Sequence, residues 1–115
     1  ALWCVFGCGG NRDRGKRPLM GAAAVQGADK VVVTSDNPRL ENPQDIINDI
    51  LPAVSVPECV EADRAAAIRY AVERAASSDI ILIAGKGHEN YQDMQGVKHH
   101  FSDFEVAEKA LAELR

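Results

Sequence analysis

The chain has 115 residues and a net charge of −4, and 46% of its residues are hydrophobic and 26% charged. This composition predicts one soluble globular domain, and the negative charge argues against nucleic acid or an anionic membrane as the main partner. No apolar run approaches the ~20 residues that a membrane span needs. Because no signal peptide is recognisable and the chain begins in a strand-like run, we expect a fragment of a cytoplasmic protein.

The cysteines and histidines do not form a recognisable metal site. Cys4 and Cys8 lack a second pair of ligands at zinc-site spacing, and with Cys59 they are odd in number. The three histidines have no cysteine or carboxylate partners at a ligand spacing. The sequence therefore predicts reduced thiols and no bound metal.

A buried strand at residues 2–6 is the first predicted element, and a loop rich in glycine and charge follows at 7–18. The dinucleotide template G-x-G-x-x-G would place its third glycine at position 12, which is Arg12. A solvated basic loop is one interpretation. We favour a binding loop for carboxylates or phosphates, because a cluster of cations lies beside a strand end. These cations are Arg12, Arg14, Lys16 and Arg17.

The loop at residues 34–39 follows a second buried strand, predicted from the three valines at 31–33. Such a loop lies at the carboxyl end of its strand, where open α/β sheets bind ligands. Asp36 can accept hydrogen bonds from an ammonium group, and Arg39 can grip a carboxylate. Asn37 can donate and accept, and Pro38 fixes one backbone dihedral. These groups suit a zwitterion, although an ordinary Asx-Pro turn with a solvated arginine explains the same residues.

Three helices are predicted before the next long strand. The first begins at Pro18 and ends at Gly27, and the second begins at Asn42-Pro43 and is stopped by Pro52. A short strand near 59–60 precedes a third helix, which Asp63 caps and which extends to about residue 76. Helical spacing places inward Leu19, Met20, Ala23 and Ala24 in the first helix, and Ala65, Ile68, Val72 and Ala75 in the third, with Arg64, Arg69, Glu73 and Arg74 mostly outward.

The run at residues 80–84 predicts a central strand, and Gly85-Lys86-Gly87-His88-Glu89 follows it. This loop is not a Walker A sequence, because Ile80 stands where the first glycine belongs and glycine follows Lys86. Its glycines expose backbone donors for a carboxylate, and Glu89 offers an anion for an ammonium group.

The remaining chain predicts short extended pieces around Gly96 and a last helix that begins with the capping box at 102–105. Strands that alternate with helices predict a single small α/β domain, with a mostly parallel sheet covered by helices on both faces. The last helix is expected to bury Phe104, Ala107, Leu111 and Leu114.

The three loops after the long strands are expected to meet at one edge of this sheet. Arg12 and Arg39 would then clamp carboxylates, and Asp36 and Glu89 would accept ammonium groups beside the backbone of Gly85. Charges so disposed cost desolvation free energy unless a complementary ligand fills the site. The pattern predicts a binding site for an amino acid with more than one zwitterionic end.

The loop at 7–18, Asp36-Asn37-Pro38-Arg39 and Gly85-Lys86-Gly87-His88-Glu89 together closely resemble the C-terminal domain of a Mur ligase, in particular of those members that add meso-2,6-diaminopimelate to the peptidoglycan precursor. The resemblance covers essentially the whole chain. It implies a Rossmann-like fold for residues 1–115, preceded in the family by an N-terminal UDP-sugar-binding domain and a central ATPase domain that this chain lacks.

The resemblance also implies part of an ATP-dependent, amide-forming ligase, with ATP and Mg²⁺ bound mainly by the missing central domain. The partners would be meso-2,6-diaminopimelate and UDP-MurNAc-L-Ala-D-Glu, the ligase would be monomeric, and the isolated fragment would be inactive, with no catalytic residue of its own. Arg39 is tied to selectivity, since its motif is altered in lysine-adding relatives. The diaminopimelate-binding positions carried over are Arg12, Asp36, Asn37, Pro38, Arg39, Gly85 and Glu89, and those expected near the nucleotide are Asp13, Arg14 and Lys16.

Two alternatives stay open. A non-catalytic, amino-acid-binding regulatory domain of α/β type would need only the zwitterion site. A nucleotide-dependent oxidoreductase fragment is disfavoured by Arg12 in the glycine template.

Overall fold

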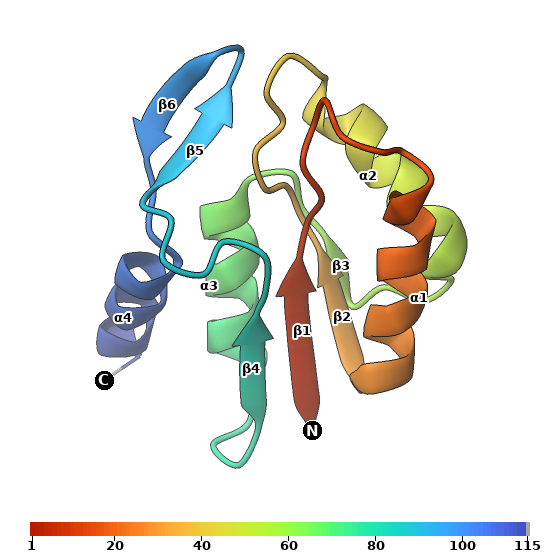
Figure 1. The fold of residues 1–115 in the computed structure, drawn as a ribbon. Helices are drawn as coiled ribbons and strands as arrows, with labels where there is room; N and C mark the ends of the chain where they lie inside the picture. Colours follow the sequence, from red (N-terminus) through yellow and green to blue (C-terminus); the bar gives the residue numbers. More distant parts are fainter. Residues whose placement is uncertain (115) are drawn as a thin grey trace.

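The computed structural model describes residues 1–114 and has at its centre a four-stranded parallel sheet in the order β3-β2-β1-β4 (Figure 1). β1 is central, and its residues pair in parallel with both β2 and β4. The α/β class and the parallel sheet predicted from the sequence are confirmed. The strands are β1 (Leu2–Phe6), β2 (Lys30–Val33), β3 (Cys59–Val60) and β4 (Ile80–Ile83).

Helices cover both faces of the sheet, as predicted (Figure 1). Because successive strand residues point to opposite faces, Cys4 and Phe6 pack with α1 and α2, while Trp3 and Val5 pack with α3 and α4. The two apolar layers fix the sheet from either side. The helices are α1 (Lys16–Gly27), α2 (Pro43–Ile50), α3 (Arg64–Arg74) and α4 (Asp103–Glu113), with a short 3₁₀ turn at Leu51–Ala53.

An antiparallel hairpin of β5 (Tyr91–Met94) and β6 (Val97–His100) lies beyond the carboxyl ends of the strands (Figure 1). Gln95 and Gly96 form its turn with φ of 56° and 80°, the left-handed geometry that a two-residue hairpin turn requires. The sequence predicted extended pieces here, and the structure pairs them. A bridge between Arg39 and Met94 attaches the hairpin to the loop after β2.

The predicted caps are confirmed at three helices. The side chains of Asn42, Asp63 and Ser102 accept hydrogen bonds from the backbone amides of Gln44, Ala66 and Glu105. Each cap satisfies an amide that has no partner within its helix. Between residues 1 and 114, no helix combines the length and the apolar character needed to cross a bilayer.

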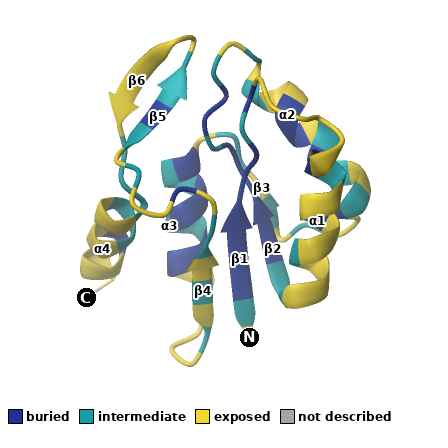
Figure 2. Cartoon of the chain, viewed as in Figure 1, coloured by how far each residue is buried: buried dark blue, intermediate teal, exposed yellow. Residues whose placement is uncertain are grey.

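β4 is an edge strand of this sheet, so the prediction of a central strand at 80–84 is wrong. Ile80 is 68% exposed and Leu82 52% exposed, whereas Cys4 on β1 and Val33 on β2, which lie on the same face of the sheet, are 8% and 0% exposed (Figure 2). The α1–α2 layer covers β1 and β2 and leaves the same face of β4 open. An apolar run predicts a strand, but it does not fix the lateral position of that strand in the sheet.

The buried faces of two helices differ from the prediction. Leu19, Met20 and Ala23 on α1 and Phe104 on α4 are exposed, and the buried residues of α1 are Arg17 and Gly21. Gly21 packs closely against α2, since a Cβ at this position would come within 3.1 Å of the Ile50 carbonyl oxygen. On α4 the buried residue is Ala110, whereas Leu111 and Leu114 are exposed.

The buried face of α3 also differs in part from the prediction. Ile68 and Val72 are buried as predicted, and the other buried residues of this helix are Arg64, Ala67 and Ala71.

Candidate functional site

The loops after β1, β2 and β4 meet at the carboxyl end of the sheet. The Gly10 amide donates to the Asn37 carbonyl at 2.7 Å, and the Arg39 guanidinium donates to the Gly10 carbonyl at 3.0 Å. The Asn37 side-chain amide donates to Glu89 Oε1 at 3.2 Å, which joins the loop after β2 to the loop after β4. The structure therefore gathers on one rim the three segments that the sequence pattern selected.

Two glycines let the first loop lie directly on the second. A Cβ at Gly7 would lie 2.4 Å from the carbonyl oxygen of Thr34, and one at Gly10 would lie 1.8 Å from that of Pro38. No side chain fits at these separations. The glycines therefore serve the close approach of two backbones.

Arg39 has a left-handed backbone, with φ of 54°, that its neighbours hold in place. Its amide donates to the Asp93 carbonyl at 2.9 Å, and its own carbonyl accepts from the Gln95 amide at 2.6 Å. The guanidinium donates to the carbonyls of Gly10 and Asn37 and has no carboxylate partner among residues 1–114. Arg39 is thus a positioned cation available to an anionic ligand.

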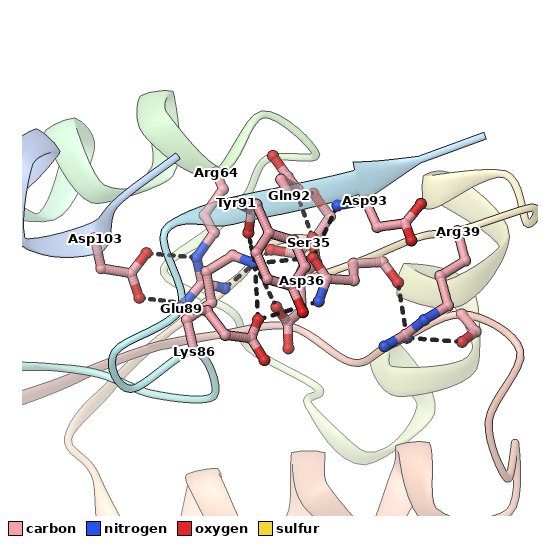
Figure 3. Close-up of polar contacts among 12 residues, drawn as sticks. Ser35, Asp36, Arg39, Arg64, Lys86, Glu89, Tyr91, Gln92, Asp93 and Asp103 are labelled. Atoms are coloured by element: carbon pink, nitrogen blue, oxygen red, sulfur yellow. Dashed lines mark hydrogen bonds and ion pairs between the residues drawn. The ribbon is translucent and has the colours of Figure 1, made fainter. Parts of the chain in front are cut away.

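A buried ammonium group lies between the predicted acidic residues (Figure 3). Lys86 is 3% exposed, and its Nζ donates to Asn37 Oδ1 at 3.0 Å and to the Tyr91 carbonyl at 2.8 Å. The same nitrogen lies 3.0 Å from Asp36 Oδ1 and 3.6 Å from Glu89 Oε1. Asp36 is therefore paired inside the protein, whereas Glu89 is the more exposed carboxylate.

Arg64 links the loop after β2 to the loop after β4. Its guanidinium donates to the carbonyls of Ser35 and Ala84 at 3.0 and 3.1 Å and forms a two-pronged ion pair with Asp103 at 2.8 Å (Figure 3). β2 and β4 are not neighbours in the sheet, so this side chain supplies a direct link between their carboxyl ends. The Gln92 side chain adds bonds to Ser35 Oγ and to the Asp36 carbonyl from β5.

The cations of the first loop fall into two groups. Arg17 is buried and binds Glu41 and Asp49, and Arg14 binds Asp49. Hydrogen bonds from Arg17 lower the pKa of Glu41, and those from Arg14 and Arg17 lower the pKa of Asp49. The second group, without an ion pair to any residue between 1 and 114, consists of the exposed Arg12 and Lys16.

Arg12 and Lys16 border a hollow of about 280 Å³ next to the Arg39 side chain. Cys8 lies in its wall, and burial raises the pKa of this thiol to about 11, so it is not a nucleophile at neutral pH. Across residues 1–114 no group of three or more His, Cys, Asp or Glu is placed to hold a metal ion. The rim therefore presents the cations Arg12, Lys16 and Arg39 and the carboxylate of Glu89.

The sequence did not predict a role in this network for three residues: Arg64, Lys86 and Gln92. Arg64 was predicted to face outward, which is wrong. The available signal was its spacing, since Arg64, Ala67, Ile68 and Ala71 share one helical face. For Lys86 and Gln92 the sequence carries no comparable signal, because their burial depends on how the hairpin docks.

The geometry defines a class of protein: an α/β domain in which cationic and acidic side chains meet at the carboxyl edge of a parallel sheet. The family model described as "Mur ligase, glutamate ligase domain" matches residues 1–87, and the chain belongs to this family. The resemblance noted from the three loops is thereby confirmed.

Relatives with curated names support the same assignment. A UDP-N-acetylmuramoyl-L-alanyl-D-glutamate–2,6-diaminopimelate ligase of Neisseria meningitidis serogroup A is 88% identical over 111 residues, which are 96% of this chain and 23% of the relative. A ligase of the same name from Chromobacterium violaceum is 61% identical over 96% of this chain and 22% of its own length. The chain therefore spans about a quarter of the length of the relatives that it matches.

A solved structure agrees with the fold. It is titled as the structure of UDP-N-acetylmuramoyl-L-alanyl-D-glutamate–2,6-diaminopimelate ligase, is 50% identical, and superposes with a TM-score of 0.92. The match covers 98% of this chain and 24% of that one. The arrangement of sheet and helices is thus that of one part of a larger ligase.

Proposed function

We propose that this chain is the C-terminal domain of an ATP-dependent ligase that adds meso-2,6-diaminopimelate to UDP-MurNAc-L-Ala-D-Glu in peptidoglycan synthesis. The names of the relatives support the reaction. The observation that carries the role of this chain is the guanidinium of Arg39, which is held by backbone carbonyls, lacks a carboxylate partner within residues 1–114, and lies on the same rim as Glu89.

Diaminopimelate fits the charge pattern of the rim. One of its two amino-acid ends presents a carboxylate for Arg39, with Arg12 nearby, and an ammonium group for Glu89. Asn37 and the backbone of Gly85 complete the contacts, and Asp36 and Pro38 shape the loop that carries them. Lysine lacks the distal carboxylate and would leave a half-buried guanidinium unpaired, a defect that supports discrimination of ~10⁴-fold.

The role of the chain in the reaction is to orient the attacking amine. The terminal carboxylate of the D-glutamyl residue is activated by ATP as an acyl phosphate, the free amine of diaminopimelate attacks its carbonyl carbon, and the tetrahedral intermediate expels phosphate. By gripping the far end of diaminopimelate, the rim aims the other amine, which is catalysis by positioning. No side chain of this chain transfers a proton in the proposal.

We place the nucleotide and Mg²⁺ mainly in the part of the ligase beyond this chain, in a central ATPase domain that follows a UDP-sugar-binding domain. The metal does not fit here, because residues 1–114 offer no cluster of ligands. Phosphate oxygens do fit beside Arg12 and Lys16, which have no ion pair in that range. Of the positions expected near the nucleotide, Lys16 and Asp13 line the hollow, whereas Arg14 is held by Asp49.

We also propose that the ligase works as a monomer in the cytoplasm. The three loops that form the rim come from one chain, and the three cysteines are free. Size-exclusion chromatography coupled to light scattering of the complete ligase tests the first part, with a single-chain mass expected.

The test uses the complete ligase with UDP-MurNAc-L-Ala-D-Glu, ATP and Mg²⁺, and compares meso-diaminopimelate with L-lysine. We expect turnover with diaminopimelate and a preference of ~10⁴-fold over lysine. Arg39→Ala is expected to lose most activity with diaminopimelate while the KM for ATP stays within about threefold. The matched control is Arg69→Ala, an arginine of α3 that pairs with Glu113 outside the rim.

Normal activity of Arg39→Ala, or equal use of lysine, would contradict the proposal. Binding of diaminopimelate by a complete protein that consumes no ATP would instead favour the regulatory alternative.

A further inference from the structure

Lys86 occupies the place between the acidic groups of the rim that a ligand ammonium would be expected to take. Its side chain is fully buried and lies beside Asp36, which is 16% exposed, and Glu89, which is 38% exposed. A buried ammonium group persists only when its protons are bonded and its charge is balanced. Lys86 has both, so it is an internal cation built into the rim.

The two carboxylates next to Lys86 are not equivalent. Asp36 Oδ1 is buried and lies 3.0 Å from Nζ, in an ion pair of poor hydrogen-bond geometry, and it receives no hydrogen bond from residues 1–114. Within residues 1–114, this oxygen is compensated by the charge of Lys86. Glu89 lies farther away, at 3.6 Å, and keeps exposed surface for another cation.

Lys86 also fixes the orientation of the Asn37 amide. Asn37 Oδ1 accepts from Lys86 Nζ and from the Asp93 amide, each at 3.0 Å. Two donors on one atom identify it as the oxygen, so the NH₂ group must point to Glu89, at 3.2 Å. Lys86 therefore sets the charge that meets a ligand and, together with the Asp93 amide, the donor pattern.

We propose that Lys86 is a positioning residue for diaminopimelate: it neutralises Asp36, turns the Asn37 amide toward Glu89, and so leaves Glu89 as the acceptor of the ligand ammonium group. This inference rests on the proposed function. In this proposal Asp36 is paired with Lys86 inside the protein, whereas the sequence pattern predicted that Asp36 would contact the ligand.

Removing one charge of the Lys86–Asp36 pair should raise the KM for diaminopimelate more than removing both charges. Lys86→Met leaves the Asp36 charge buried and unpaired, and Asp36→Asn leaves Lys86 free to pair with Glu89 and compete with the ligand. Asp36→Asn/Lys86→Met removes both charges, keeps the shapes, and leaves Glu89 available. The energies of the single changes should therefore not add.

The experiment measures kcat and KM for diaminopimelate and ATP in the complete ligase and its three variants. We expect each single variant to raise the KM for diaminopimelate by ~30-fold or more, with kcat and the KM for ATP within about threefold, and the double variant to recover to within ~10-fold of the parent. Arg69→Ala serves as the control outside the rim.

A double variant worse than either single variant, or an unchanged Lys86→Met, would overturn the inference. Circular dichroism shows whether Lys86→Met folds. If it does not, Asp36→Asn is compared with the double variant, because pairing of the two charges predicts that adding Lys86→Met to Asp36→Asn restores activity. Failure of the parent ligase to use diaminopimelate would instead contradict the proposed function. The failure of the proposed function is therefore distinguishable from the failure of the inference about Lys86.

Discussion

The loops after β1 and β2 leave neighbouring strands at the same edge of the sheet, yet they are built in opposite ways. Residues 11–16 of the first loop are all exposed, and two of its cations lack ion pairs within residues 1–114. In the second loop Thr34, Ser35 and Asn37 are buried. The hairpin, Lys86 and Arg64 hold the second loop from three directions.

This difference separates the two tasks that the rim is proposed to perform. A tightly bonded loop can hold diaminopimelate in one orientation, because its donors and acceptors are fixed before the ligand arrives. An exposed loop with spare cations can adapt to phosphates presented by another part of the ligase. The buried polar residues that bond to side chains of other segments therefore mark the specificity side of the rim.

Replacing the buried arginine that bonds to each loop should lower the free energy of unfolding by different amounts. Arg64→Met leaves Asp103 and two carbonyls without their donor and is expected to lower the free energy of unfolding by about 3–5 kcal/mol. Arg17→Met should cost only about 1–2 kcal/mol, because Glu41 and Asp49 are partly exposed and can be solvated. Urea unfolding of the 115-residue chain measures both, and equal losses would contradict the difference between the loops.

Separating the two loops should damage activity. Gly10→Ala would drive a Cβ into the Pro38 carbonyl and displace Arg39, so we expect a loss of ~10²-fold in kcat/KM for diaminopimelate in the complete ligase. Gly27→Ala is the matched control, since a Cβ there meets nothing within 4 Å. If both variants kept full activity, contact between the loops would not matter for the site.

Within the exposed loop, Lys16 should affect the nucleotide alone. Lys16→Ala is expected to raise the KM for ATP by roughly tenfold and to leave the KM for diaminopimelate within about twofold, because Lys16 lies beside the hollow and away from Glu89. Steady-state kinetics of the complete ligase measure both constants. An unchanged KM for ATP would remove Lys16 from the nucleotide side.

The smallest effects concern the thiols. With a pKa raised to about 11, Cys8 is protonated at neutral pH, and its alkylation should speed up only as the pH rises toward that value. Cys59 is only partly buried, so we expect iodoacetamide at pH 8 to modify it at least roughly tenfold faster than Cys8. Mass spectrometry of the time course gives both rates, and faster modification of Cys8 would contradict its place in the packed wall.

The sequence was sufficient to predict the order of elements and the convergence of the loops. Strand runs, caps and turn residues act locally, and parallel strands bring their carboxyl ends together, so Arg39 and Glu89 could be placed on one rim. It was not sufficient for the burial of Arg64 and Lys86, because the cost of burying a charge is offset only by partners from distant segments. The exposed Phe104 and Ile80 show the same limit for apolar residues.

The most direct measurement is a crystal structure of the complete ligase with meso-diaminopimelate bound. We predict one carboxylate of the ligand within hydrogen-bond distance of the Arg39 guanidinium, the ammonium group of the same end beside Glu89, and Lys86 still paired with Asp36. A ligand bound away from Arg39, or one whose ammonium group displaces Lys86 from Asp36, would contradict the roles assigned to this rim.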